Sequence, residues 1–268
     1  MRLLFRALAG LCAICACAAI AAPDYAREKR WADEITPAIL VGDAVYLTQK
    51  SGHKFLAVHA PNASGSKARA GVIVVHGMGV HPDWNLINVL RSQLAEQGYA
   101  TLSVQMPVLA SDAKGEQYPA LFPDAAERLQ AAVTFFRDKG QRKIALVSHS
   151  MGARMSNGFL ADAAAGHIDA WVAIGISGGE FNRVAQFKRP VLDIYGERDL
   201  PAVLAKAAAR ADFQRAVVGL VNLGGITFRL LRLRVDVSAL FHQQGRHVGV
   251  MLGDGPHQRR LPAPGIPG

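Results

Sequence analysis

Residues 143–152 read Lys-Ile-Ala-Leu-Val-Ser-His-Ser-Met-Gly, an apolar run followed by small and polar residues. The apolar run is typical of a buried β-strand. Ser148 and Gly152, both small, stand two positions before and two positions after Ser150. This spacing lets the chain turn sharply out of the strand, and we predict a helix over 153–165. Ser150 would then lie near a helix N-terminus, where a negative charge is favoured.

The small residues around this serine resemble the nucleophile elbow, G-x-S-x-G, with Ser148 in place of the first glycine. A serine hydroxyl is a weak nucleophile until a fixed geometry presents it to a base. The strained strand-to-helix turn of the elbow provides that presentation. We therefore predict that Ser150 is a catalytic nucleophile.

A second motif follows another apolar run at residues 71–75. Residues 76–79 read His-Gly-Met-Gly, which resembles the HG-x-G segment that helps to form the oxyanion hole of lipases and esterases. The order of strand, HG-x-G, helix, strand, helix, strand, elbow and helix resembles the α/β-hydrolase superfamily. The resemblance implies that the backbone N–H groups of Met78 and Met151 hold an oxyanion.

The pattern of the remaining elements predicts the α/β class, with a mostly parallel sheet flanked by helices. Asp83 is predicted to cap a helix over 84–97, which ends at Gly98. Residues 107–123 are predicted to form a long loop. Further strands are predicted at 43–47 and 55–60, which form a hairpin, and at 100–105, 170–176 and 191–195, with a further helix at 124–137.

The last of these strands ends in a candidate acid. Residues 191–199 read Val-Leu-Asp-Ile-Tyr-Gly-Glu-Arg-Asp, and in the superfamily a strand that ends G-x-x-D here commonly carries the acid. The resemblance assigns Asp199 to orient the catalytic histidine and to stabilise its charged form. The alternative is that Asp199 caps a helix that begins near Pro201. Glu197 is the second choice, and Asp193 lies inside the strand.

The catalytic histidine is the missing member of the triad. In the superfamily it follows the last strand, but the corresponding interval after Asp199 contains no histidine. His242 follows a β-like run at 228–237 and is the first choice; the alternative is a surface histidine in an irregular tail. The other candidates for the base are His247 and His81, whereas His76 and His149, inside the two motifs, are interpreted as structural.

The first 21 residues are predicted to be a signal peptide. They combine a positively charged start with an apolar run at 8–20, which is short for a membrane span. Ala-Ile-Ala at 19–21 fits the cleavage rule, so the mature chain would begin at Ala22 in the periplasm or outside the cell. The alternatives are an uncleaved N-terminal anchor and, from the loose lipobox at 14–17, a lipoprotein.

Composition changes near residue 212. After Asp212 the chain contains no lysine, glutamate, tyrosine or tryptophan. We predict an α/β-hydrolase-like domain over 22–211 and an atypical C-terminal region over 212–268. A shifted reading frame and a divergent C-terminus are both compatible with this change.

Charge and cysteine content exclude several function classes. The formal net charge is +9, and the region from 212 onward contributes +4 of it through seven arginines and three aspartates. No basic helix or aromatic platform indicates nucleic-acid binding. No fingerprint or ligand spacing indicates a cofactor or a metal. All three cysteines precede residue 22, so the mature chain would have no disulfide and no thiol catalysis.

Residues 74–84 and 100–107 resemble, more narrowly, a little-characterised bacterial branch of α/β-hydrolase-like envelope proteins, a domain of unknown function. The resemblance implies a serine hydrolase that acts on an ester, thioester or amide, with a small-molecule or lipid-like ester as the expected substrate. The alternative is a catalytically inactive binding or envelope-interaction protein on the same fold. The presence of a catalytic histidine distinguishes the two.

Overall fold

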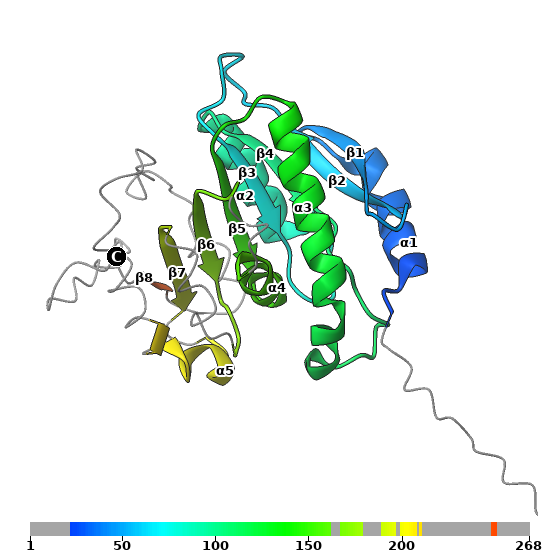
Figure 1. The fold of residues 1–268 in the computed structure, drawn as a ribbon, viewed down its shortest axis with the longest axis vertical. Helices are drawn as coiled ribbons and strands as arrows, with labels where there is room; N and C mark the ends of the chain where they lie inside the picture. The colour runs from blue at the N-terminus through cyan, green and yellow to red at the C-terminus, as the bar shows by residue number, and fades with distance from the viewer. Residues whose placement is uncertain are drawn as a thin grey trace, which may run out of the picture.

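The computed structural model describes residues 22–161, 167–178, 189–196, 199–207, 209–210 and 248–250. Within these ranges a twisted eight-stranded sheet forms the centre of the molecule, with helices on both faces (Figure 1). The predicted signal peptide, Glu197, His242 and His247 lie outside the described residues, as does nearly all of the region after 211.

The strand order is β1-β2-β4-β3-β5-β6-β7-β8. β3 to β7 run parallel to one another, β1 and β2 form the predicted antiparallel hairpin, and β8 pairs antiparallel with β7. This confirms the mostly parallel sheet. The strands are β1 (Asp43–Thr48), β2 (Lys54–Ala60), β3 (Gly71–Val75), β4 (Ala100–Val104), β5 (Ile144–His149), β6 (Ala170–Ile174), β7 (Val191–Gly196) and β8 (Val248–Val250).

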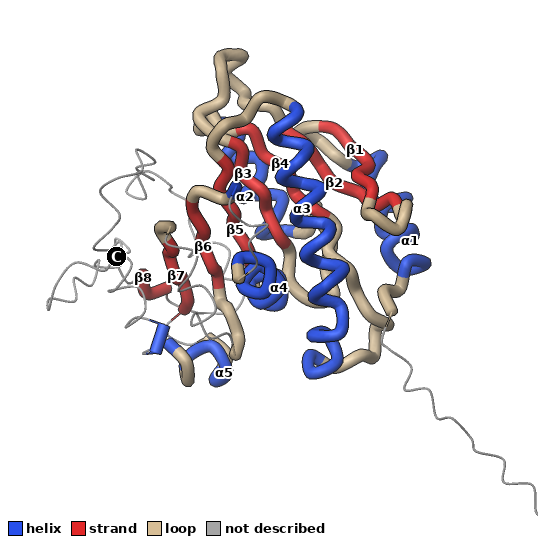
Figure 2. The backbone as a smooth tube through the Cα atoms, in the orientation of Figure 1, coloured by secondary structure: helices blue, strands red, loops and turns tan. Residues whose placement is uncertain are grey.

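Helices cover both faces of the sheet, with α3 and α4 on one face and α2 on the other (Figure 2). Alternate side chains of β3 point to opposite faces of the sheet, so this strand packs against helices on both faces. Ile73 and Val75 pack with α3 and α4, whereas Val72 and Val74 pack against α2. The helices are α1 (Tyr25–Ile35), α2 (Asn85–Glu96), α3 (Phe122–Asp138), α4 (Met151–Leu160) and α5 (Pro201–Leu204), with short 3₁₀ turns at Thr36–Ala38 and Gly115–Leu121.

The prediction that Asp83 caps α2 is wrong. Trp84 is the N-cap residue, and no side chain caps this helix. Asp83 instead accepts hydrogen bonds from Asn88 at 2.8 Å and from Arg91 at 2.5 Å. Arg91 is fully buried. A buried guanidinium without a counter-charge costs more free energy than a helix end without a side-chain cap. The ion pair therefore determines where this carboxylate points.

Helix α1 precedes every predicted element and was missed. Asp24 caps it by accepting a hydrogen bond from the Arg27 N–H at 2.9 Å. Glu28, Ala32 and Ile35 are its buried residues, and this i, i+4, i+7 spacing is the signal that would have revealed it. The segment predicted as a loop at 107–123 also contains a 3₁₀ turn, and α3 begins inside it.

The first turn of α4 packs directly on the end of β3. A Cβ atom on Gly152 would lie 2.2 Å from the carbonyl oxygen of His76 and 2.8 Å from Cγ1 of Val75. Backbone meets backbone at this point, so no side-chain rearrangement can make room. The glycine that ends the elbow motif is therefore required by the packing of two elements far apart in the sequence.

Gly152→Ala is expected to destabilise the fold by at least about 1–3 kcal/mol, the usual cost of forcing atoms into a packed core. Gly158→Ala is the matched control, because it lies in the same helix and its new Cβ would meet, among the described residues, only the Phe122 ring at 3.5 Å. The control should be neutral or stabilising by up to about 1 kcal/mol. Urea denaturation measures both, and equal stabilities of the two variants would contradict this packing.

Candidate active site

Ser150 has the backbone conformation that a nucleophile elbow requires. Its φ of 54° and ψ of −121° make it the one non-glycine residue with positive φ in the described part of the chain. Such a conformation costs about 1–3 kcal/mol and persists where the surrounding structure enforces it. The Ser150 N–H donates to the carbonyl of Ile174 at the end of β6 at 2.8 Å. The helix that follows starts at Met151, two residues before its predicted start.

The HG-x-G segment lies against this turn. β3 and β5 are parallel neighbours, with Val75 opposite Ser148, so both motifs leave the sheet at the same edge. A Cβ on Gly77 would lie 3.1 Å from Cβ of Ser150 and 3.2 Å from Nδ1 of His149. Residues 76–84, which follow β3 and which we call the oxyanion loop, therefore begin in contact with the proposed nucleophile.

The predicted oxyanion-hole donors are the backbone amides of Met78 and Met151. Met151 is the first residue of α4, where an N–H group has no partner within the helix. Among the described residues, no acceptor receives a hydrogen bond from the Met78 N–H or the Met151 N–H. Within the described part of the chain, neither predicted oxyanion-hole donor therefore has an acceptor for its N–H, and their role stays a prediction.

His76 connects the oxyanion loop to the segment after β4. Its Nε2 accepts a hydrogen bond from the Met106 N–H at 2.9 Å, which places the ring proton on Nδ1. Nδ1 then donates to the carbonyl of Gly77 at 2.8 Å. Complete burial lowers the pKa of His76 to about 3. These contacts agree with the interpretation of His76 as a structural, neutral side chain.

His149 is also buried and neutral. Burial lowers its pKa to about 4, while the charge of Asp199 acts in the opposite direction. Its ring stacks with that of Trp84, with centroids 6.3 Å apart, and its Nδ1 has no hydrogen-bond partner among the described residues.

Asp199 lies beside the same end of β6 that binds Ser150. Its Oδ2 would be 3.5 Å from a Cβ on Gly175, the residue after Ile174. Its two oxygens accept hydrogen bonds from the N–H groups of Gly196 at 3.2 Å and Leu200 at 2.7 Å. Leu200, not Asp199, is the N-cap residue of α5, so the structure does not support the capping alternative. Ser150 and Asp199 therefore flank one strand end, at the carboxyl edge of the parallel strands.

The structure brings no base to this pair within the described residues. No described histidine hydrogen-bonds to Asp199. His81 is half-buried, its Nδ1 accepts the Asp83 N–H at 3.3 Å, and its ring packs against Trp31. The first choice, His242, lies outside the described residues and stays a prediction.

Two buried arginines that support the oxyanion loop were missed from the sequence. Arg91 and Arg128 are fully buried, and each extends from a helix face that is otherwise apolar. An arginine at a core-facing position of a helical pattern is the signal that would have found them, because a charge is buried only when it is paired.

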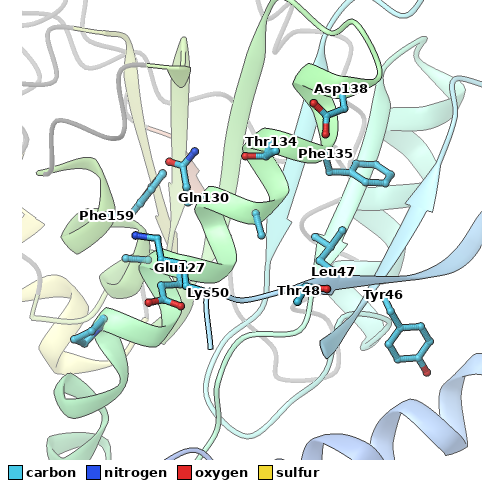
Figure 3. A pocket seen from close by; sticks show the side chains of 13 residues that line it. Tyr46, Leu47, Thr48, Lys50, Glu127, Gln130, Thr134, Phe135, Asp138 and Phe159 are labelled. Carbon is cyan, nitrogen blue, oxygen red and sulfur yellow. The ribbon is translucent and has the colours of Figure 1, made fainter. Parts of the chain in front are cut away.

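A separate pocket of about 690 Å³ lies between β1 and α3 (Figure 3). It is lined by side chains such as Leu47, Gln130 and Phe135, with Phe159 from the far end of α4. None of the predicted site residues lines it. This pocket is therefore distinct from the edge that carries the elbow.

Solved structures share this fold. The chain matches the esterase Pf2001 of Pyrococcus furiosus at 15% identity and a TM-score of 0.51, covering 65% of this chain and 78% of that one. It matches ATU1826, a protein of unknown function from Agrobacterium tumefaciens, at 17% identity and a TM-score of 0.52, covering 65% and 79%. Est1E of Butyrivibrio proteoclasticus matches at 17% identity and a TM-score of 0.50, covering 63% and 84%. The protein has the α/β-hydrolase fold.

A family model also matches part of the chain. Residues 16–125 match the family described as "Protein of unknown function (DUF3530)". The matched segment includes α1 and the oxyanion loop but ends before the elbow. No curated protein sequence matches the chain.

The two buried histidines make an acid-sensitive fold. In the unfolded chain both imidazoles titrate near pH 6.5, whereas burial lowers the pKa values of His76 and His149 to about 3 and about 4. The unfolded state binds more protons between these values, so stability that is present above pH 6.5 is lost as pH falls.

Denaturant titrations at a series of pH values between about 7 and 4.5 should show this slope. His76→Gln is expected to be less stable at pH 7 but to have a shallower slope, because one buried imidazole no longer has to be protonated on unfolding. His167→Gln, at an exposed position, should retain the wild-type slope. An unchanged slope in the His76 variant would exclude this linkage.

Proposed function

We propose that this protein is a serine hydrolase that cleaves an ester, thioester or amide bond with Ser150 as the nucleophile. One observation carries the proposal: the strained Ser150 backbone lies in contact with Gly77 of the oxyanion loop. A chain that only needed to turn at this point would not require a serine in a conformation that costs free energy. The chain shares its fold with proteins named as esterases, such as Pf2001, which supports ester hydrolysis as the reaction.

In the proposed reaction, Ser150 Oγ attacks the carbonyl carbon and its proton passes to a histidine. The Met78 and Met151 N–H groups stabilise the tetrahedral oxyanion, a contribution of about 3–4 kcal/mol for each donor. The histidine then protonates the leaving group, and water hydrolyses the acyl-serine to restore Ser150. Asp199 orients the histidine. His242 is the proposed base, with His247 and His81 as the next candidates.

The surroundings of the site favour an apolar substrate. Met78 on the oxyanion loop is 44% exposed, and Leu200, directly after Asp199, is 55% exposed. Exposed large apolar side chains mark a binding site where they form a contiguous patch. We propose a small-molecule or lipid-like ester as the substrate.

We also propose that the protein acts in the periplasm or outside the cell, after cleavage before Ala22. Among the described residues, no helix has both the length and the apolar character to span a membrane. Mass spectrometry of the protein from envelope fractions should find Ala22 at the N-terminus. Intact Met1 on protein from the cytoplasmic fraction would contradict the proposal.

A second function is a catalytically inactive binding protein on the same fold. It is favoured by the absence of a hydrogen-bonded histidine at Asp199 in the described part of the chain. A change of reading frame near residue 212 would explain such a loss. Sequencing the gene around that codon separates a shifted frame from a divergent C-terminus.

A fluorophosphonate probe should label Ser150 in the active protein, and Ser150→Ala should abolish labelling. Ser156→Ala is the control, because Ser156 lies in the same helix and its buried hydroxyl has no described partner. Asp199→Asn should slow turnover by about 10⁴-fold, as loss of the triad acid does elsewhere. His242→Ala should reduce activity about as much as loss of the serine, because triad members act as a unit.

Other outcomes of the labelling experiment assign the function differently. Activity that survives His242→Ala but not Ser150→Ala moves the base to His247 or His81. No labelling of this chain, with labelling restored by a corrected reading frame, identifies an inactive copy of a hydrolase.

A further inference from the structure

We propose that helix α1 is a positioning element of the site, because its buried Glu28–Arg128 ion pair holds the oxyanion loop in place. The consequence for catalysis rests on the proposed function, whereas the effect on the loop does not. Glu28 stands four residues after Asp24, the residue that caps α1, at the start of the described chain.

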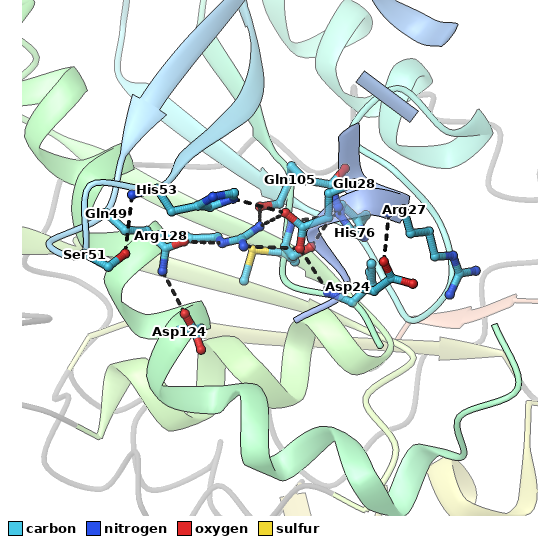
Figure 4. A network of polar contacts seen from close by, with 12 residues as sticks. Asp24, Arg27, Glu28, Gln49, Ser51, His53, His76, Gln105, Asp124 and Arg128 are labelled. Atoms are coloured by element: carbon cyan, nitrogen blue, oxygen red, sulfur yellow. Dashed lines mark hydrogen bonds and ion pairs between the residues drawn. The ribbon is translucent and has the colours of Figure 1, made fainter. Parts of the chain in front are cut away.

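The ion pair joins parts of the chain that are 100 residues apart. Arg128 Nη1 and Nη2 donate to the two carboxylate oxygens of Glu28 at 2.9 and 3.2 Å (Figure 4). Glu28 is 5% exposed and Arg128 is fully buried. Burial raises the pKa of Glu28, and the Arg128 charge and hydrogen bond act against this rise. Two parallel bonds to a planar guanidinium define direction as well as distance.

Arg128 also binds the segment that follows β4. Its Nη1 also donates to the carbonyl of Gln105 at 3.0 Å, and its Nε donates to the side chain of Gln49 at 3.3 Å. The next residue, Met106, donates its N–H to His76, as described above. The Gln105 amide nitrogen also lies 3.2 Å from Nε2 of His76. The chain of contacts therefore runs from α1 to the residue that precedes Gly77.

α1 reaches the same region by a second route. The Asp24 N–H donates to the carbonyl of Val108 at 2.7 Å, and Arg27 Nη1 donates to the carbonyl of Leu109 at 2.7 Å. The other guanidinium nitrogen of Arg27 would be 4.0 Å from a Cβ on Gly79, inside the oxyanion loop. α1 thus contacts the segment after β4 through Asp24 and Arg27, and it contacts the loop through the packing of Trp31 against the ring of His81.

A buried ion pair is an inefficient way to add stability, because removing two charges from water consumes much of their attraction. The advantage of a buried ion pair is that it holds its two side chains in one defined arrangement. Displacement of an oxyanion-hole amide by 1 Å can cost about 100-fold in rate. Arg128 is linked through Gln105 and Met106 to His76, the residue before Gly77. A defined arrangement of the pair therefore helps to fix the oxyanion loop.

The test compares Glu28→Gln with Asp33→Asn, its matched control. Asp33 lies on the same helix, and its pair with Lys29 is exposed. Hydrogen exchange followed by mass spectrometry reports on the peptide around Met106, whose N–H donates to Nε2 of His76. We expect exchange there to become at least tenfold faster in Glu28→Gln, with β5 and α2 unchanged and with wild-type exchange in Asp33→Asn. A folded Glu28→Gln protein with wild-type exchange at Met106 overturns the proposal.

Two conservative variants keep the test decisive if Glu28→Gln does not fold. Glu28→Asp retains the charge on a shorter side chain, and Arg128→Lys retains the charge without the planar fork. Both should show faster exchange of the Met106 N–H than the wild type, and the nitrogen-15 chemical shifts of the His76 ring should move from those of a pure Nδ1–H tautomer. Wild-type values for both measurements in both variants overturn the proposal.

Labelling of Ser150 supplies the catalytic test. In Glu28→Asp the maximal rate of fluorophosphonate labelling should fall about tenfold or more while the probe concentration at half-maximal rate stays unchanged, because the donors move and the substrate surface does not. If the wild type is not labelled, the proposed function fails while the exchange result still decides the role of α1. Labelling at the wild-type rate in a Glu28→Asp protein with a loosened loop contradicts the catalytic consequence.

Discussion

The close contact between the first turn of α4 and the end of β3 is the constraint on which the site depends. Gly152 meets the carbonyl of His76 at a distance that leaves no room for a side chain. Because this contact is backbone against backbone, it places the elbow and the oxyanion loop relative to each other with almost no freedom. Ser150 must then enter its left-handed conformation between β5 and α4, and Gly77 must lie against it. The strain at the serine and the two glycines are parts of one geometric requirement.

Buried arginines supply what apolar packing cannot. The sheet and its two helical layers set the ends of the strands, but an apolar core leaves the direction of a following loop poorly defined. Arg128 acts on the start of the oxyanion loop through Gln105 and His76. Arg91 acts on its end, because its guanidinium donates to Asp83 and to the carbonyl of Val41. Each charge is paired, so each has a low free energy in one arrangement of its neighbours only.

The ionisable groups around the site differ in burial, and their roles differ accordingly. Burial keeps His76 and His149 neutral, which suits side chains that hold backbone in place and makes either a weak base. Asp199 remains partly accessible, and its oxygens accept two backbone N–H groups that determine where it points. A base that served Ser150 and Asp199 would have to be less buried than these two histidines. The proposals for His242 and for an inactive copy differ on this one group.

The amino-acid sequence by itself determined those parts of the protein whose cause is local. The apolar runs of β3 and β5 and the small residues around Ser150 could be interpreted because strand formation and a tight turn depend on neighbouring residues. Tertiary structure alone decided the roles of Asp83 and Glu28. The local pattern predicted that Asp83 caps a helix, but its carboxylate pairs with the buried Arg91. Glu28 finds its partner 100 residues away, and the free energy of a buried charge depends on which group the fold places beside it.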